Sequence, residues 1–162
     1  MIMKRYFALL LLVFLAAGAR AQSLTLSDIA NLASLDGSQA HTSLTFEKPF
    51  RELYSEEANG FVIAHYQGTT PASKSETIII GYGVKNSAGN ILHNVTYTST
   101  NVNYVLRLIT EAKSAGLVKL FQGADADKNI YLFNSYLYTV NIYINNDNSR
   151  GSVEIKQNDV SE

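Results

Sequence analysis

A series of short segments rich in valine, isoleucine, tyrosine and threonine limits the possible folds of this chain most strongly. Such segments, bounded by turn-forming residues, predict β-strands. The connections between them, among them the polar clusters 86–90 and 145–151, are too short for parallel crossovers, so the strands are predicted to be antiparallel. The six clearest predicted strands are 61–67, 77–84, 91–99, 117–121, 136–144 and 152–156, and 44–46 and 130–133 are shorter candidates.

Two segments show helical periodicity instead. Residues 27–35 have apolar side chains at helical spacing, and Gly37 can stop this helix in a left-handed turn. Residues 102–115 have a longer apolar stripe, preceded by Asn101 as a cap and followed by Gly116 as a stop. The expected fold is therefore α+β, an antiparallel sheet with two helices packed on one face.

The order of these elements suggests two degenerate helix-plus-hairpin repeats, whose helices start about 75 residues apart. Each half has a helix, a glycine, a short strand ending at Phe46 or Phe121, a charged stretch and a long hairpin. The glutamates of the stretch 52–57 are predicted to lie in a solvated connection. In this scheme the strand 91–99 has no counterpart in the second half.

The N-terminus predicts export. Lys4 and Arg5 precede an apolar run at 7–17, and Ala19 and Ala21 occupy the two specificity positions, so we predict a signal peptide at 1–21. The apolar run is too short to span about 30 Å of hydrocarbon, so no membrane anchor is expected after cleavage. The absence of cysteine excludes disulfides and a lipid at the cleavage site, which favours a bacterial periplasmic or secreted protein.

Removing 21 of the 162 residues leaves 141, which suits a single α+β domain at 22–157 with a frayed C-terminal tail at 158–162. The formal charge of −1 becomes −4, because three basic residues leave with the signal peptide. The ten remaining basic residues are scattered along an acidic domain. Nucleic acid is therefore not an expected partner.

No catalytic or cofactor motif is recognisable. The histidines, His41, His65 and His93, lack the close spacing of metal ligands, and no GxSxG elbow or cysteine is present. The acidic cluster 125–129 lacks the glycine and the glutamate of a calcium loop, and a solvated turn is expected there. We therefore assign no catalytic residue, no metal ligand and no cofactor, and the sequence favours a protein that is not an enzyme.

Alternation along the predicted strands separates an apolar face, expected to meet the helices, from a polar one. The polar face is either an ordinary solvent-exposed surface or a docking surface, where Tyr143 and the flat strip of Gly81 and Gly83 let another chain approach closely. The candidate binding residues on it are Asn94, Thr96, Thr98, Thr139, Asn141 and Tyr143.

The leading hypothesis is an exported, non-enzymatic binding module that contacts a protein partner through this polar face. One alternative is a small-ligand carrier with an apolar pocket between helix and sheet, lined by Ile78, Tyr82 and Tyr97. Another is a hydrolase whose residues meet only in the folded chain and include His65 or His93.

The helix 102–115 with Gly116 and the strands 117–121, 136–144 and 152–156 follow an order of elements that resembles secreted β-lactamase-inhibitor proteins, built from tandem α/β modules. The resemblance spans most of residues 24–157 as element order. It implies a polar, tyrosine-bearing sheet face that grips a protein partner. The chain differs from that family in having no cysteine. A single unit is also similar to cystatin-like folds, although the mature chain is long for one.

Overall fold

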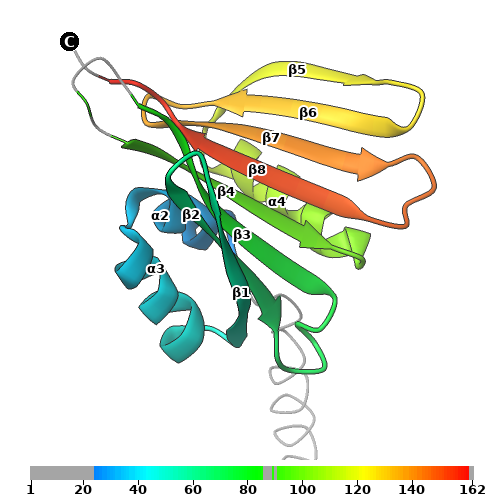
Figure 1. The fold of residues 1–162 in the computed structure, drawn as a ribbon. Helices are drawn as coiled ribbons and strands as arrows, with labels where there is room; N and C mark the ends of the chain where they lie inside the picture. Colours follow the sequence, from blue (N-terminus) through cyan, green and yellow to red (C-terminus); the bar gives the residue numbers. More distant parts are fainter. Residues whose placement is uncertain (1–23, 86–88, 90, 161–162) are drawn as a thin grey trace, which may run out of the picture.

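The computed structural model describes residues 24–85, 89 and 91–160, and the predicted signal peptide lies outside them. These residues form one eight-stranded antiparallel sheet in the order β1-β2-β3-β4-β8-β7-β6-β5 (Figure 1). The helices lie on one face of the sheet, which confirms the predicted α+β class. The helical segments are α2 (Leu26–Ser34), α3 (Gly37–Thr42), the π-helical turn η1 (Ser43–Glu47) and α4 (Val102–Ser114). The strands are β1 (Phe50–Ala58), β2 (Phe61–Gly68), β3 (Glu76–Lys85), β4 (Ile91–Ser99), β5 (Val118–Ala124), β6 (Lys128–Asn134), β7 (Tyr138–Asn145) and β8 (Gly151–Gln157).

The segment that joins α2 to the sheet is helical, so the strand predicted at 44–46 is wrong. Gly37 begins a helix rather than stopping one. The side chain of Asp36 accepts a hydrogen bond from the Gln39 N–H, and the Gln39 side chain accepts one from the Asp36 N–H. Ala40 and Leu44, four residues apart, are both buried. This reciprocal cap and the apolar spacing outweigh the strand propensity of three residues.

Strand β1 is a further correction, because the charged stretch 52–57 belongs to it and not to a solvated connection. β1 is an outermost strand of the sheet, and most of its residues are exposed. Charged side chains are common on edge strands, where they discourage pairing with other chains. The charges that suggested a loop therefore fit the position of β1 in the sheet.

The two halves of the sheet repeat one pairing scheme. β1 to β4 form a meander, α4 follows, and β5 to β8 form a second meander. β4 and β8 pair antiparallel with Thr96 opposite Glu154, which relates the halves by an approximate two-fold axis at this pair (Figure 1). β8 is thus the counterpart of β4, contrary to the sequence prediction that strand 91–99 has none.

The repeat extends to irregularities in the outermost strands. The register of β1 shifts between Glu52 and Tyr54, and that of β5 shifts between Lys119 and Phe121. Each shift marks a β-bulge in which one leucine, Leu53 or Leu120, has no opposite residue. Matching bulges support two structurally equivalent units of four strands each.

The core lies between the helices and the sheet face that they cover. α2 contacts β4 and β8, and α4 contacts β4, β7 and β8. For the described side chains the predicted alternation is confirmed, except that Tyr136 lies before β7 and is 73% exposed. The buried strand residues on this face include Ile78, Ile80, Val95, Tyr97, Val140, Ile142, Val153 and Ile155.

The predicted helix at 102–115 matches α4. The side chain of Asn101 accepts a hydrogen bond from the Asn103 N–H, and Gly116 follows the helix with a φ of +75°. Residues 125–127 of the acidic cluster form the turn between β5 and β6, as predicted, whereas Lys128 and Asn129 begin β6. In this turn Asp125 accepts hydrogen bonds from the N–H groups of Asp127 and Lys128. Asn158, assigned by sequence to a frayed tail, bonds through its side chain to the β6–β7 turn.

Candidate functional site

All six predicted binding residues lie on the sheet face opposite the helices, which we call the open face. They occupy β4 and β7, and β8 runs between these two strands. The register aligns them in three rows with β8 residues in the middle, as Asn94–Lys156–Thr139, Thr96–Glu154–Asn141 and Thr98–Ser152–Tyr143. The structure therefore brings the predicted residues together around three β8 side chains that the sequence analysis did not select.

The centre of the open face is a network of polar contacts. The Lys156 Nζ lies 3.1 Å from the Glu154 Oε1, and the Asn141 amide donates to the Glu154 Oε2 over 3.4 Å. The Lys128 Nζ lies 5.8 Å from the centre of the Tyr143 ring, within the range of a cation–π contact. All these side chains except the lysines are partly buried by their neighbours. The centre is thus polar, with charges of both signs.

The middle row continues to both edges of the sheet. Pairing in the five other ladders extends it across all eight strands, as Tyr54–His65–Ile79–Thr96–Glu154–Asn141–Leu132–Phe121. An aromatic side chain ends the row on each side, and Tyr54 and Phe121 are 53% and 48% exposed. Each directly follows the bulged leucine of its strand. The two aromatics are thus equivalent positions of the two halves.

Tyr54 is held in place by the next side chain of the row. Its ring stacks on that of His65 with centres 4.2 Å apart and planes 17° apart. The His65 Nε2 in turn lies 3.2 Å from the Glu56 Oε1. Phe121 lies against its own strand, because its ring occupies the space where a side chain on Gly123 would begin. The two aromatics are therefore positioned by local contacts and still exposed.

Tyr143 and Gly81 both lie on the open face, as predicted, but they are not neighbours. Gly81 lies in β3 and Tyr143 in β7, with β4 and β8 between these strands. The space above Gly81 is occupied by the Asn94 side chain, whose Oδ1 would lie 2.8 Å from a Cβ added there. Gly81 thus accommodates a neighbouring side chain of the same face.

A second cluster of polar side chains lies under α3, on the helix face. The His41 Nδ1 is 2.9 Å from the Glu52 Oε2 and 3.3 Å from the Tyr66 hydroxyl, and Ser55 donates to the Glu52 Oε1 over 2.5 Å. These residues line a cavity of about 260 Å³. Burial, together with the negative charge of Glu52, raises the pKa of Tyr66 to about 12, so its phenol is neutral at ordinary pH.

This cluster brings a histidine, a carboxylate and a hydroxyl together, but its contacts have the wrong order for nucleophilic catalysis. Ser55 bonds to Glu52, whereas an activated serine bonds to the imidazole that accepts its proton. His65 lies on the open face, away from this cavity. Burial lowers the pKa of His93, and the negative charge of Asp36 offsets only part of this effect. The described contacts of His41 therefore tie α3 to β1 and β2.

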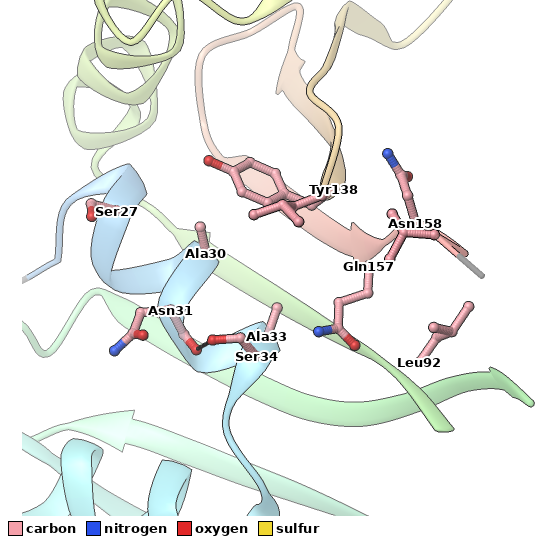
Figure 2. A pocket seen from close by; sticks show the side chains of 11 residues that line it. Ser27, Ala30, Asn31, Ala33, Ser34, Leu92, Tyr138, Gln157 and Asn158 are labelled. Carbon is pink, nitrogen blue, oxygen red and sulfur yellow. Dashed lines mark hydrogen bonds between the residues drawn. The ribbon is translucent and has the colours of Figure 1, made fainter. Parts of the chain in front are cut away.

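A groove of about 520 Å³ opens between α2 and one end of the sheet (Figure 2). One wall is α2, with Ser27, Ala30 and Asn31, and the facing wall includes Tyr138 and Gln157. This is not the pocket suggested by the sequence. Ile78 and Tyr97 are fully buried in the core and do not line the groove. Tyr82 is not among the residues whose side chains the structure describes.

Comparison of the chain with models of protein families, with curated proteins and with solved structures gave no match. Within residues 24–85, 89 and 91–160, no three histidine, aspartate or glutamate side chains gather in a way that could hold a metal ion. None of the described helices is both long and apolar enough to cross a membrane.

The three β8 residues in the middle of the open face could have been predicted from the sequence. The strand predicted at 152–156 alternates Ser152, Glu154 and Lys156 with valine and isoleucine, so its polar face could have been assigned. Tyr54 was missed for a different reason, because its strand was taken for a loop. Phe121 was assigned to a strand without a face, since the bulge beside it shifts the alternation.

Proposed function

We propose that this protein is an exported, non-enzymatic binding module that holds one folded protein partner on its open face. The observation that supports this most is the row from Tyr54 to Phe121, in which two exposed aromatics flank a polar centre. Aromatic side chains are enriched among the residues that dominate binding energy, because they bury a large area with few rotatable bonds.

The dimensions of the open face suit a protein better than a small molecule. Eight strands spaced about 4.8 Å apart place the outer strands about 34 Å from each other. A strip of that width and about 20 Å in height has an area of about 700 Å², close to the roughly 800 Å² that each partner contributes to a standard interface. Small ligands instead bind in concave sites.

The polar centre suits recognition of a surface with hydrogen-bonding groups. Thr96, Thr98 and Asn141 present hydroxyl and amide groups, while Glu154 and Lys156 compensate each other at 3.1 Å. Contact with a partner would therefore desolvate a paired charge instead of an isolated one, which avoids much of the cost of burying charge. The resemblance to secreted β-lactamase-inhibitor proteins supports the same mode of binding.

Capture of partners from a periplasmic or culture-supernatant extract tests this function. The wild-type protein should retain a specific partner, and Tyr54→Ala with Phe121→Ala should reduce its affinity by at least tenfold. Tyr143→Ala with Thr96→Arg should abolish capture, because an arginine at the centre of the face keeps the surfaces apart.

The matched control is Phe46→Ala. Phe46 is 83% exposed but belongs to η1, on the helix side of the sheet, so partner binding should not change. Equal binding by the wild type and both open-face variants, with all proteins folded by circular dichroism, would show that the open face is not the contact surface. The export step is tested separately, since N-terminal sequencing of the protein from cells should begin at Gln22.

A further inference from the structure

We propose that the groove between α2 and the ends of β4, β7 and β8 is a second binding site, and that it takes a neutral carbohydrate of one or two sugar rings. The groove lies beside α2 at one end of the sheet and contains none of the residues of the three open-face rows. The inference is therefore independent of the proposed protein partner.

The size of the groove is appropriate for such a ligand. Its volume of about 520 Å³ falls within the roughly 300–1,000 Å³ typical of small-molecule sites. Its walls come from α2, from Leu92 of β4, and from the segment around Leu137 and Tyr138. Elements distant in sequence thus enclose it from opposite sides, and helix packing against the sheet fixes their separation.

The lining excludes a charged ligand. Among the described residues, those that line the groove include no aspartate, glutamate, lysine, arginine or histidine. A phosphate, carboxylate or ammonium group entering it would lose hydration without gaining an opposite charge. The ligand that fits this lining is neutral.

The same lining is unsuited to a purely apolar ligand. The Ser34 hydroxyl donates to the Asn31 carbonyl over 2.8 Å and keeps lone pairs that can accept a further hydrogen bond. Gln157 accepts a bond from the His93 N–H through its Oε1, and Figure 2 shows its amide nitrogen on the side facing α2. An alkyl chain would desolvate these groups without replacing their bonds to water.

A sugar ring satisfies both requirements. Its C–H face can lie on the ring of Tyr138, which Figure 2 shows facing Ala30 of α2. Its hydroxyls can then donate to the Ser34 hydroxyl and accept from the Gln157 amide, which lie on the two facing walls. An apolar surface with a few well-placed polar groups is the usual composition of a specific small-molecule site.

Backbone amide NMR titration of the purified protein tests the site. The probes are N-acetylglucosamine, maltose and cellobiose, with gluconate as the charged comparison and octanol as the apolar one. At least one neutral sugar should bind at millimolar concentration, shifting amide signals of α2, Leu92 and Gln157, and more tightly than either comparison probe. Absence of binding by all three sugars, or tighter binding of gluconate or octanol, would overturn the proposal.

Matched variants locate the binding. Tyr138→Ala should weaken sugar binding about tenfold, since it removes the stacking surface. Tyr136→Ala, two residues away and outside the groove, should leave binding unchanged. Ser34→Ala should weaken binding, whereas Ser114→Ala at the exposed end of α4 should not.

Ala30→Trp provides a second approach if Tyr138→Ala fails to fold. Ala30 is partly buried at the edge of the core, and a tryptophan there fills the groove and should abolish sugar binding. Retained sugar affinity in a folded Ala30→Trp protein would place any binding elsewhere and refute the assignment to this groove.

Discussion

The two halves of the sheet share one pairing scheme but differ in the chemistry of their outer hairpins. At equivalent register positions, Glu52 lies opposite Tyr66 in the first half and Lys119 lies opposite Phe133 in the second. Tyr66 and Phe133 are both buried, at 2% and 0% exposure. Similar backbone geometry therefore supports a polar cluster in one half and an apolar one in the other.

The difference extends to what covers each hairpin. In the first half, His41 of α3 bonds to Glu52 and to the hydroxyl of Tyr66. In the second half, Lys119 contacts only its neighbour Gln122 among the described hydrogen bonds, and Val118 and Leu120 are 63% and 60% exposed. The two halves thus have the same hydrogen-bond register, while the side chains at their outer edges differ.

The largest expected loss of stability comes from removing the buried aromatic side chain of the second half, Phe133. Phe133→Ala should lower the free energy of unfolding by about 3–5 kcal/mol, because it leaves a cavity at a fully buried position. Urea denaturation measures this. Phe121→Ala, in the same hairpin but half-exposed, should cost far less. Equal losses for the two variants would mean that Phe133 is not part of a rigid core.

Exchanging the hydroxyl between the halves tests how far they have diverged. Tyr66→Phe removes a hydroxyl that contacts His41 and should cost about 1 kcal/mol. Phe133→Tyr places a hydroxyl in an apolar site and should cost about 1–3 kcal/mol. Phe133→Tyr should therefore be the more harmful change by urea denaturation. The reverse order would show that the second half already offers a polar partner at this position.

The smallest expected effect is a loss of stability at alkaline pH, which arises from tyrosines of the first half. Because the pKa of Tyr66 is raised to about 12, its contribution to stability is complete below its ordinary pKa of about 10 and is lost as the pH rises toward 12. Tyr97, also in this half, has a raised pKa through burial and the nearby Glu76. Urea midpoints across this range should fall, and Tyr66→Phe should weaken the fall. An unchanged slope in Tyr66→Phe would contradict the prediction.

The sequence predicted the central strands and α4 well, because each of them is buried on one face only. Their apolar residues therefore recur at the spacing of a strand or of a helix. It missed β1, where Glu52, Glu56 and Glu57 reflect an edge position that alternation does not report. It also missed α3, because Gly37 was interpreted as a helix stop and the reciprocal cap of Asp36 and Gln39 was not recognised.

The candidate site was predictable in its members but not in its arrangement. Alternation placed Thr96 and Asn141 on one polar face, as the structure does. The pairing of β4 with β8 joins residues more than fifty positions apart, and nothing in either strand specifies the other. The alignment of Tyr54 with Phe121 depends on that pairing and on two bulges, so it emerges only from the folded chain.

The two bulges also determine where the sheet ends. An outer strand with regular hydrogen-bond spacing can recruit a further strand from another molecule, and repeated recruitment builds fibrils. In β1 and β5 the extra leucine interrupts that spacing, so an incoming strand finds only short stretches in register. The same irregularity that sets the aromatic side chains in place thus opposes the addition of a ninth strand at either edge of the sheet.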